Sequence, residues 1–413
     1  MTTAVTSPAE VGMHPDRLAR IRPVMESYVD ERGVVGISTM VSRRGRVVHA
    51  EQFGFRDREA GAPMADDTIF RIYSMTKPVV STALMLLHEE GRFQLEHPVA
   101  QYLPAFATVE VLAEDGSLVD PVRPVQVRDL LTHTSGLTYD FMADNPVAQL
   151  YRDARIMNDA TRSLEALVDE VATLPLAFQP GTRWHYSVGI DVAARLIEVL
   201  TGATLGDVLR DRIFDPLGMV DTGFGVPEDR LDRLAAMYGL PDLIGENYSF
   251  AELSEAALAG FNERIDVSTT YPTDAPDVFQ RGGVGLFSTA EDYMRFAQML
   301  AAGGIHDGQR VIGRKTLELM HANHLDAGLL PYELAGLPVP GMGFGLGSRV
   351  MLDVAQTAGP GSTGEYGWAG AAKTYFWVDP SEELVGLFMS QYMTGTLLPE
   401  RDFRSLVYQA IDD

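Results

Sequence analysis

The chain has 413 residues, of which 46% are hydrophobic and 9% aromatic, so it can bury a large core, and its length suits two closely packed subdomains better than one. Asp and Glu number 57 against 33 Lys and Arg, and the resulting formal charge of −24 argues against nucleic-acid or membrane partners because it repels phosphates and anionic lipids. Cysteine is absent, which excludes disulfides, thiolate catalysis and cysteine-based metal sites.

Targeting and metal signals are also missing from the sequence. Residues 1–30 carry charges throughout and contain no apolar run of signal-peptide length, and no uninterrupted apolar run of about 18 residues follows. The nine His are scattered, without a His-Glu-x-x-His pattern. We therefore expect a cytoplasmic protein with no membrane anchor and no metal site.

The N-terminal part combines one helix with one hairpin. Residues 16–30 have the spacing of an amphipathic helix. Residues 34–42 and 46–53 are rich in strand-forming residues and flank the turn Arg43-Arg44-Gly45, which predicts an antiparallel pair.

Helix signals dominate the middle of the chain. Four helices are predicted there, at residues 74–90, 127–132, 188–200 and 288–302, and each has a start or stop signal at one end. Ser288, with Glu291 three residues later, predicts a capping box for the last of these. Residues 238–280 and 321–342 look irregular, and we expect these long segments to shape a substrate pocket.

The C-terminal part resembles the N-terminal part in kind. Residues 366–378 and 384–390 read as strands around a turn at 379–382, and residues 401–411 read as a closing helix. This order predicts an α+β fold with an antiparallel sheet built from N- and C-terminal segments and flanked by helices. Residues 1–95 and 282–413 would form the sheet lobe, residues 96–281 a mainly helical lobe, and a catalytic cleft would lie between them.

Ser74 and Lys77 form the first candidate for chemistry. On a helix, positions i and i+3 share a face, so the lysine amine would lie beside the serine hydroxyl. Pro78 is tolerated only in the first helical turn, which places Ser74 at the helix start, where backbone N–H groups and the helix dipole favour negative charge. Alone the pattern is weak, because about one Ser-x-x-Lys is expected by chance in a chain of this length.

Two further segments supply what acyl transfer would need. Tyr186 follows a turn-rich stretch and precedes a predicted helix, and a phenol can shuttle protons when a nearby ammonium lowers its pKa. An edge strand beside the helix start can give a second oxyanion donor next to the N–H of Ser74. The run Trp368-Ala369-Gly370-Ala371 fits, with Gly370 permitting close approach and Ala371 donating its N–H.

Together these residues resemble the serine β-lactamase-like superfamily, shared by class C β-lactamases, DD-peptidases and family VIII carboxylesterases, from about residue 10 to the C-terminus. Four motifs carry the resemblance: Tyr-Ser-Met-Thr-Lys at 73–77, Leu-Leu-Thr-His-Thr-Ser-Gly-Leu at 130–137, Phe-Gln-Pro-Gly at 178–181 before Tyr186, and Gly-Gly-Val-Gly-Leu-Phe-Ser-Thr at 282–289. The resemblance implies that Ser74 is acylated, Lys77 is its partner and Tyr186 is the general base. It also implies a structural turn at 132–137, with His133 as a packing residue.

Departures from the family pattern point to the substrate. Lactamases and DD-peptidases carry Tyr-x-Asn and Lys-Thr-Gly, whereas this chain has Val188 in the third position and Trp368-Ala369-Gly370 on the edge strand. A rival alignment would use Lys373 as the lysine of Lys-Thr-Gly. Lys373 lies five residues after Trp368, so on a regular strand the two side chains would point to opposite faces, and the glycine is missing. We therefore interpret Lys373 as an ordinary strand residue. The combination matches family VIII carboxylesterases, and Trp368 would present an apolar wall that favours uncharged esters.

The resulting hypothesis is a cofactor-independent serine carboxylesterase acting on small esters. Tyr139 and Phe344 are further candidates for the pocket, together with Gly370, Val188 and Trp368. The alternatives on the same site are an amide hydrolase of the β-lactamase or D-aminopeptidase type and an acyltransferase. A non-catalytic scaffold would be expected to lose Ser74, Lys77 or Tyr186. The oligomeric state stays open.

Overall fold

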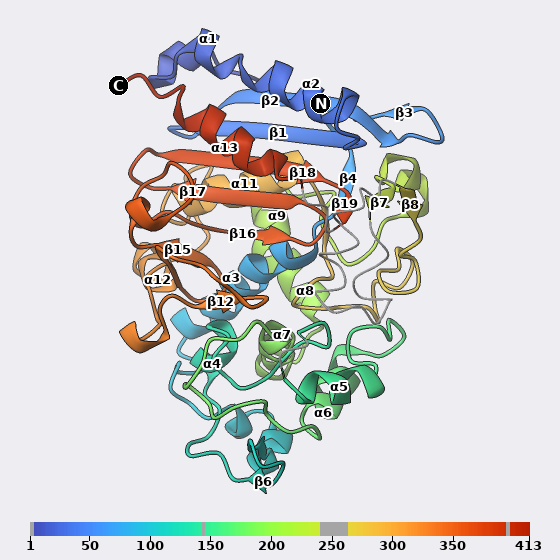
Figure 1. Cartoon of the computed structure of the whole chain (residues 1–413), viewed down its shortest axis with the longest axis vertical. Coiled ribbons are helices and arrows are strands. Elements are labelled where there is room, and N and C mark those ends of the chain that lie inside the picture. The colour runs from blue at the N-terminus through green and yellow to red at the C-terminus, as the bar shows by residue number, and fades with distance from the viewer. Residues whose placement is uncertain (1–3, 143–144, 240–262, 394–396) are drawn as a thin grey trace.

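A computed structural model describes residues 4–142, 145–239, 263–393 and 397–413. Within these residues, the largest sheet has eight strands in the order β14-β15-β16-β17-β18-β1-β2-β3, and all neighbours are antiparallel (Figure 1). N- and C-terminal segments meet in its middle, where Ile37 pairs with Ser390. The predicted α+β class and the origin of the sheet are therefore confirmed. The strands are β1 (Gly36–Arg43), β2 (Arg46–Asp57), β3 (Ala62–Pro63), β14 (Met342–Phe344), β15 (Arg349–Met351), β16 (Tyr366–Gly370), β17 (Thr374–Asp379) and β18 (Leu384–Ser390).

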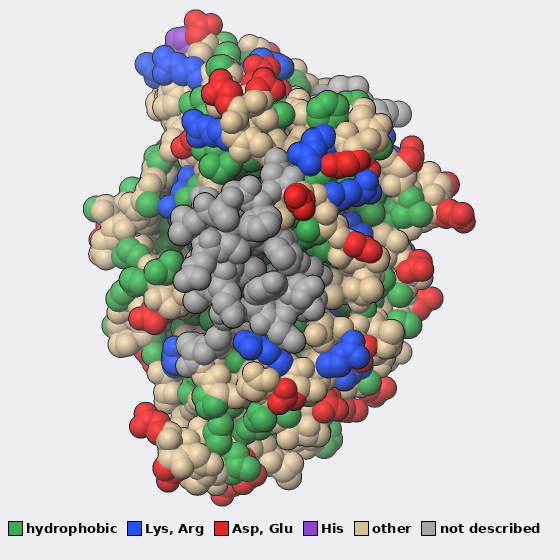
Figure 2. Space-filling view, turned by 45° about the vertical axis from the view of Figure 1, so that its right-hand side comes forward, with side chains coloured by type: hydrophobic (Ala, Val, Ile, Leu, Met, Phe, Trp, Pro, Cys, Tyr) green, Lys and Arg blue, Asp and Glu red, His purple; other side chains and the backbone are tan. Residues whose placement is uncertain are grey.

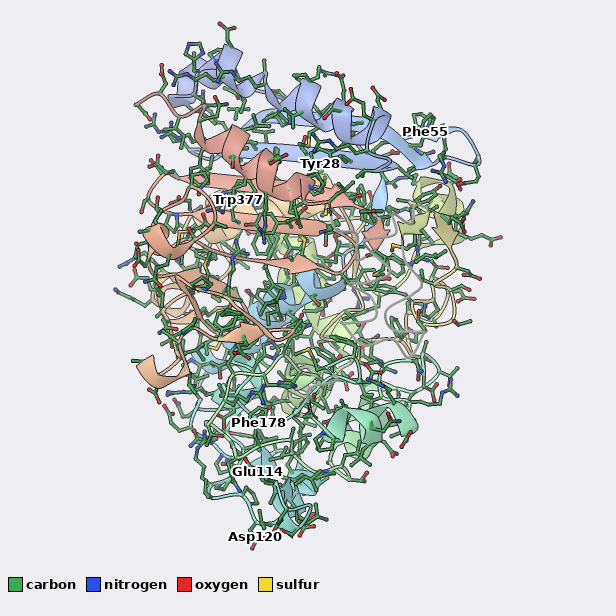
Figure 3. All side chains as sticks on the ribbon, viewed as in Figure 1. Tyr28, Phe55, Glu114, Asp120, Phe178 and Trp377 are labelled. Atoms are coloured by element: carbon green, nitrogen blue, oxygen red, sulfur yellow. The ribbon has the colours of Figure 1, made fainter. Side chains whose placement is uncertain are left out.

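Each face of the sheet has its own core, because successive side chains of a strand point to opposite faces. Trp377 and Phe388 pack under helices α2 and α13, where Figure 3 labels Trp377, whereas their neighbours Phe376 and Leu387 belong to the core on the other face, which includes α11. The helices are α1 (Pro15–Leu18), α2 (Ile21–Asp30), α3 (Thr76–Glu89), α4 (Val127–Leu131), α5 (Val147–Asp153), α6 (Leu164–Val171), α7 (Gly189–Thr201), α8 (Leu205–Leu209), α9 (Asp215–Leu217), α11 (Ala290–Ala301), α12 (Arg314–Met320) and α13 (Pro399–Tyr408).

Helix α3 connects the sheet to the helices drawn below it in Figure 1. Every residue from Thr76 to Leu87 is buried, and α3 packs closely against α7. A helix that is apolar all round must be covered all round, and α3 therefore forms the centre of the molecule. The division into a sheet lobe and a helical lobe stays a prediction.

Three sequence-based boundaries were wrong. The expected strand at 366–378 is two strands, β16 and β17, joined by a turn in which Lys373 has a φ of 59°, so Lys373 is a turn residue. The capping box of Ser288 does not form, because α11 begins at Ala290 and the side chain of Thr289 accepts the N–H of Asp292. The helix predicted at 16–30 is divided into α1 and α2. Local composition gave no sign of these one- to three-residue breaks.

The segments expected to be irregular contain short strands. Residues 240–262 of the first segment lie outside the described residues, and the second holds the hairpin β12–β13. No helix among the described residues is long and apolar enough to cross a membrane. The cytoplasmic location stays a prediction. The shorter strands are β4 (Ile69–Arg71), β5 (Val111–Leu112), β6 (Leu118–Val119), β7 (Met237–Gly239), β8 (Glu263–Ile265), β9 (Phe287–Thr289), β10 (Ile305–His306), β11 (Gln309–Arg310), β12 (Glu333–Leu334), β13 (Leu337–Pro338) and β19 (Tyr392–Met393).

Charged side chains are mixed on the face of the molecule that Figure 2 shows. Outside the grey area, basic and acidic groups alternate there and form no continuous basic patch.

A buried ion pair beneath α13 provides a test of the fold. The Glu365 carboxylate has no exposed surface and accepts from Arg404 Nη1 at 2.7 Å and Tyr408 Oη at 2.8 Å. We expect Glu365→Ala to destabilise the protein by about 3–5 kcal/mol, because it leaves the Arg404 cation buried without its partner. The shift in urea-unfolding midpoint measures this effect.

Glu26 supplies the control, because its ion pair with Arg22 is solvent-exposed. Glu26→Ala should cost less than about 1 kcal/mol. Equal losses in the two variants would contradict the structural importance of the Glu365 site.

Candidate active site

Ser74 lies in a single 3-10 turn, η2 (Tyr73–Met75), directly before α3. Tyr73 has a φ of 45°, an uncommon conformation for a residue with a side chain. Such local backbone strain is often found at functional positions. Pro78 occupies the first turn of α3, as the sequence predicts, and Ser74 is 9% exposed.

Lys77 is directed back at Ser74 from the first turn of α3. Its Nζ donates to Ser74 Oγ at 3.1 Å and to the Gly283 carbonyl at 2.8 Å. The side chain has no exposed surface, and the ring centre of Tyr186 lies 4.5 Å from Nζ. The amine is therefore fixed by one carbonyl and one hydroxyl in a dry environment.

Tyr186 reaches the same serine from the segment before α7. Its Oη donates to Ser74 Oγ at 2.7 Å, although the two residues are 112 positions apart in the chain. The structure thus brings Ser74, Lys77 and Tyr186 together on one oxygen atom.

Burial shifts the pKa values of Lys77 and Tyr186 in opposite directions. It lowers the pKa of Lys77 to about 7, an effect that the charge of Asp191 partly offsets. It raises the pKa of Tyr186, and the hydrogen bonds from Trp368 and to Ser74 only partly counteract the rise. The expected lowering of the tyrosine pKa is therefore wrong. Near neutral pH, this site can offer a neutral amine as base and a protonated phenol as donor.

Trp368 and Val188 occupy the two positions where the family resemblance predicts the loss of polar groups that lactamases and DD-peptidases carry. Trp368 lies on β16, and its indole N–H donates to Tyr186 Oη at 3.3 Å. This contact was missed from the sequence, which predicted only an apolar wall. Val188 is fully buried at the start of α7.

The end of β16 lies against the turn that carries Ser74. A Cβ on Gly370 would be 2.4 Å from the Ile72 carbonyl oxygen, so only glycine allows this approach. Thr374 Oγ1 also donates to the Ile72 carbonyl, at 3.2 Å. Ala371 follows Gly370 directly, and its role as an oxyanion donor stays a prediction.

Aromatic side chains enclose Tyr186. Tyr139 and His133 have ring centres 5.1 and 4.9 Å from that of Tyr186. Phe344 packs edge-on against both His133 and Trp368. Tyr139 and Phe344 are fully buried, and their assignment to a substrate pocket stays a prediction. His133 is a buried packing residue whose pKa burial holds well below its usual value, and its Nδ1 contacts Ser187 Oγ at 3.2 Å.

The contacts of two residues behind Lys77, Asp191 and Gly283, were missed by sequence reasoning. Asp191, on α7, accepts the N–H of Gly283 at 3.0 Å, and Gly283 in turn accepts from Lys77. Asp191 is the only charged residue between Val188 and Ala194, at the start of a predicted helix, and this could have been the signal. Among the described residues, no cluster of three His, Asp or Glu is placed to hold a metal ion.

A cavity of about 630 Å³ lies elsewhere, between the segment after α5 and residues 268–278. Its lining includes Arg155, Thr161 and Val278 but none of Ser74, Lys77 and Tyr186. The convergence of reactive groups, rather than the size of a cavity, therefore identifies the candidate active site.

Known proteins resemble the chain over nearly its whole length. An uncharacterized protein of Mycobacterium tuberculosis is 36% identical over 366 residues, 86% of each chain. Esterase EstB of Burkholderia gladioli is 32% identical over 390 residues, 92% of each chain. The solved structure of EstCE1, described as a hydrolase with promiscuous acyltransferase activity, gives a TM-score of 0.77 at 27% identity and covers 95% of this chain and 99% of its own.

The model of the Beta-lactamase family matches residues 21–409. The resemblance predicted from the four motifs, including its esterase branch, is confirmed by these matches. The chain therefore belongs to the Beta-lactamase family.

Proposed function

We propose that this protein is a serine carboxylesterase that hydrolyses small carboxylic esters through an acyl-enzyme on Ser74. One observation carries the proposal: Ser74 Oγ accepts hydrogen bonds from both Lys77 Nζ, at 3.1 Å, and Tyr186 Oη, at 2.7 Å. A nucleophile in contact with a base and a second proton carrier is the arrangement that acyl transfer requires. The esterase name of EstB, 32% identical, supports the same reaction class.

In the proposed acylation, Ser74 Oγ attacks the ester carbonyl carbon while its proton moves to the neutral amine of Lys77. A pKa of about 7 leaves much of this amine unprotonated near neutral pH, so Lys77 replaces Tyr186 as the first proton acceptor. The N–H groups of Ser74 and Ala371 stabilise the tetrahedral oxyanion. When the carbon–oxygen bond breaks, Tyr186 gives its proton to the departing alkoxide and is reprotonated from Lys77.

Deacylation repeats these steps with water. The water proton passes through Tyr186 to Lys77 as the hydroxyl oxygen bonds to the acyl carbon. Collapse of the second oxyanion breaks the bond to Ser74 Oγ, which recovers a proton, and the carboxylic acid leaves. This cycle uses no cofactor.

Substrate preference is proposed to follow from Trp368 and Val188. Trp368 offers no cation and Val188 no amide, so these two positions do not supply groups that would bind the carboxylate and acylamide of a β-lactam. An uncharged ester has no such groups to leave unpaired. We therefore place esters before lactams and peptides as substrates.

Acyl transfer to an alcohol is the second candidate. The described activity of EstCE1, whose fold this chain shares, favours it. With a p-nitrophenyl ester and rising concentrations of a short alcohol, we expect a new alkyl ester to appear while p-nitrophenol release stays constant or rises, because the alcohol competes with water for the acyl-enzyme. Chromatography of the products measures the partition. Free acid as the sole product at every alcohol concentration would exclude this candidate.

Ser74→Ala should reduce hydrolysis of a short p-nitrophenyl ester by at least about a thousandfold, since it removes the nucleophile. The wild type should cleave the lactam nitrocefin poorly under the same conditions. Ser81→Ala is a matched control, because Ser81 is a buried serine of α3, the helix that directly follows Ser74, and its Oγ has no partner among the described residues. Retained activity in Ser74→Ala would overturn the mechanism, and efficient nitrocefin cleavage would overturn the substrate preference.

The pH dependence should report the state of Lys77. Because the neutral amine is the active form, kcat/KM should rise with pH through about 7 and then level off. Stopped-flow or steady-state hydrolysis between pH 5 and 9 measures the profile with an ester that is stable in this range. A rate that is highest at pH 5 would contradict a lysine base.

A further inference from the structure

Asp191 is a buried carboxylate that the proposed chemistry does not use directly. It lies in the first turn of α7 and is 1% exposed. Its Oδ1 accepts the N–H of Gly283 at 3.0 Å, and its Oδ2 has no partner among the described residues. A carboxylate buried at such cost needs a compensating role.

Gly283 connects this carboxylate to the candidate base. Its N–H donates to Asp191, and its carbonyl accepts from Lys77 Nζ at 2.8 Å. A Cβ on Gly283 would lie 2.6 Å from Asp191 Oδ2 and 2.8 Å from Tyr139 Oη, so a side chain has no room there. Asp191 therefore anchors the residue whose carbonyl accepts from Lys77.

Several titratable groups surround Lys77. Tyr186, Tyr139 and His133 face it from the segments before α7 and after α4, and burial keeps all three neutral near pH 7, since it raises the pKa of both phenols and lowers that of the imidazole. Burial raises the pKa of the Asp191 carboxyl, and the hydrogen bond from Gly283 and the charges of Lys77 and Arg281 only partly offset this rise. Asp191 is the carboxylate whose charge acts on Lys77 and raises its pKa.

We propose that Asp191 is a positioning residue for Lys77: it holds Gly283 so that the carbonyl keeps the amine on Ser74, and it places a negative charge behind this amine. This inference rests on the proposed function, in which the amine of Lys77 accepts the serine proton. It assigns the first turn of α7 a part in the reaction that the motif residues alone do not reveal.

Asp191→Asn tests the two parts separately. The amide oxygen can still accept from Gly283, but the charge is gone. We expect the acid limb of kcat/KM for a p-nitrophenyl ester to move to lower pH by about one unit, because an amine loses basicity when a nearby negative charge is removed. The plateau should fall as well, since a weaker base accepts the serine proton less readily.

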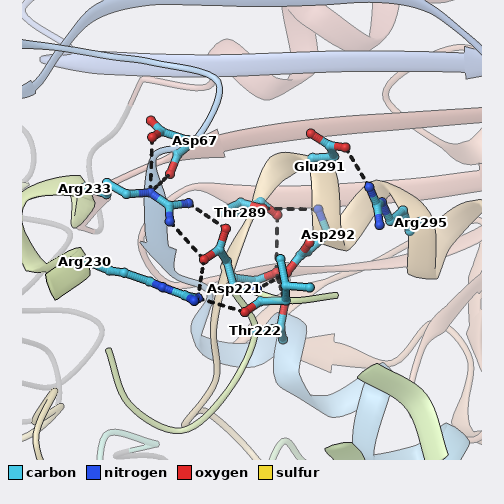
Figure 4. A network of polar contacts seen from close by, with 11 residues as sticks. Asp67, Asp221, Thr222, Arg230, Arg233, Thr289, Glu291, Asp292 and Arg295 are labelled. Atoms are coloured by element: carbon cyan, nitrogen blue, oxygen red, sulfur yellow. Dashed lines mark hydrogen bonds and ion pairs between the residues drawn. The ribbon is translucent and has the colours of Figure 1, made fainter. Parts of the chain in front are cut away.

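Asp292→Asn is the matched control. Asp292 also lies in the first turn of its helix, α11, is also buried, and also accepts a backbone N–H from a distant segment, that of Asp221 at 2.7 Å (Figure 4). Its charge does not act on Lys77. We expect Asp292→Asn to change the melting temperature about as much as Asp191→Asn does, but to leave the acid limb of kcat/KM at the wild-type pH.

The outcomes separate this inference from the function on which it rests. A wild type without Ser74-dependent ester hydrolysis refutes the proposed function itself. If the wild type shows the expected pH profile but Asp191→Asn leaves the acid limb at the wild-type pH, only the proposed role of Asp191 is overturned. If Asp191→Asn does not fold, the smaller uncharged Asp191→Ser replaces it, and failure of both to fold would assign Asp191 a purely structural role and likewise overturn the proposal.

Discussion

The burial of the Lys77 amine is the constraint on which the rest of the site depends. An ammonium group without solvent loses its hydration, so the pKa of Lys77 falls to about 7 and the neutral amine becomes accessible. That burial is a consequence of the position of α3, which is buried from Thr76 to Leu87 and packs against α7 and α8. A helix at the surface with the same Ser-x-x-Lys spacing would carry a solvated ammonium, and its lysine would be a poor base at neutral pH.

The same dry environment assigns different tasks to lysine and tyrosine. Desolvation penalises the charged form of each group, which is the cation of Lys77 and the anion of Tyr186. The lysine therefore becomes easier to deprotonate and the tyrosine harder. Trp368 adds an indole N–H to Tyr186 Oη, so strand β16 contributes a polar contact to the tyrosine. These facts favour a lysine base with a tyrosine relay over a tyrosine base.

Three chain segments must meet for this environment to exist. The turn η2 brings Ser74, the segment before α7 brings Tyr186, and residues 282–285 bring the carbonyl that accepts from Lys77. Glycines permit the closest contacts, since Gly370 lies against the Ile72 carbonyl and Gly283 lies against Asp191 and Tyr139. The support for the base therefore comes from residues that have no chemistry of their own.

The sequence by itself determined the fold class, the hairpin at β1 and β2, the family motifs and the spacing of Ser74 and Lys77, because each of these depends on local patterns of a few residues. It did not reveal the turn that places Lys373 outside a strand, the start of α11 at Ala290, or the contacts of Asp191, Gly283 and Trp368. Only the tertiary structure decided which groups lose water and which carbonyl meets Lys77, 206 residues away in the chain. A pKa depends on the solvent and charges that surround a group in space, and these are set by the packing of distant segments rather than by the neighbours in sequence.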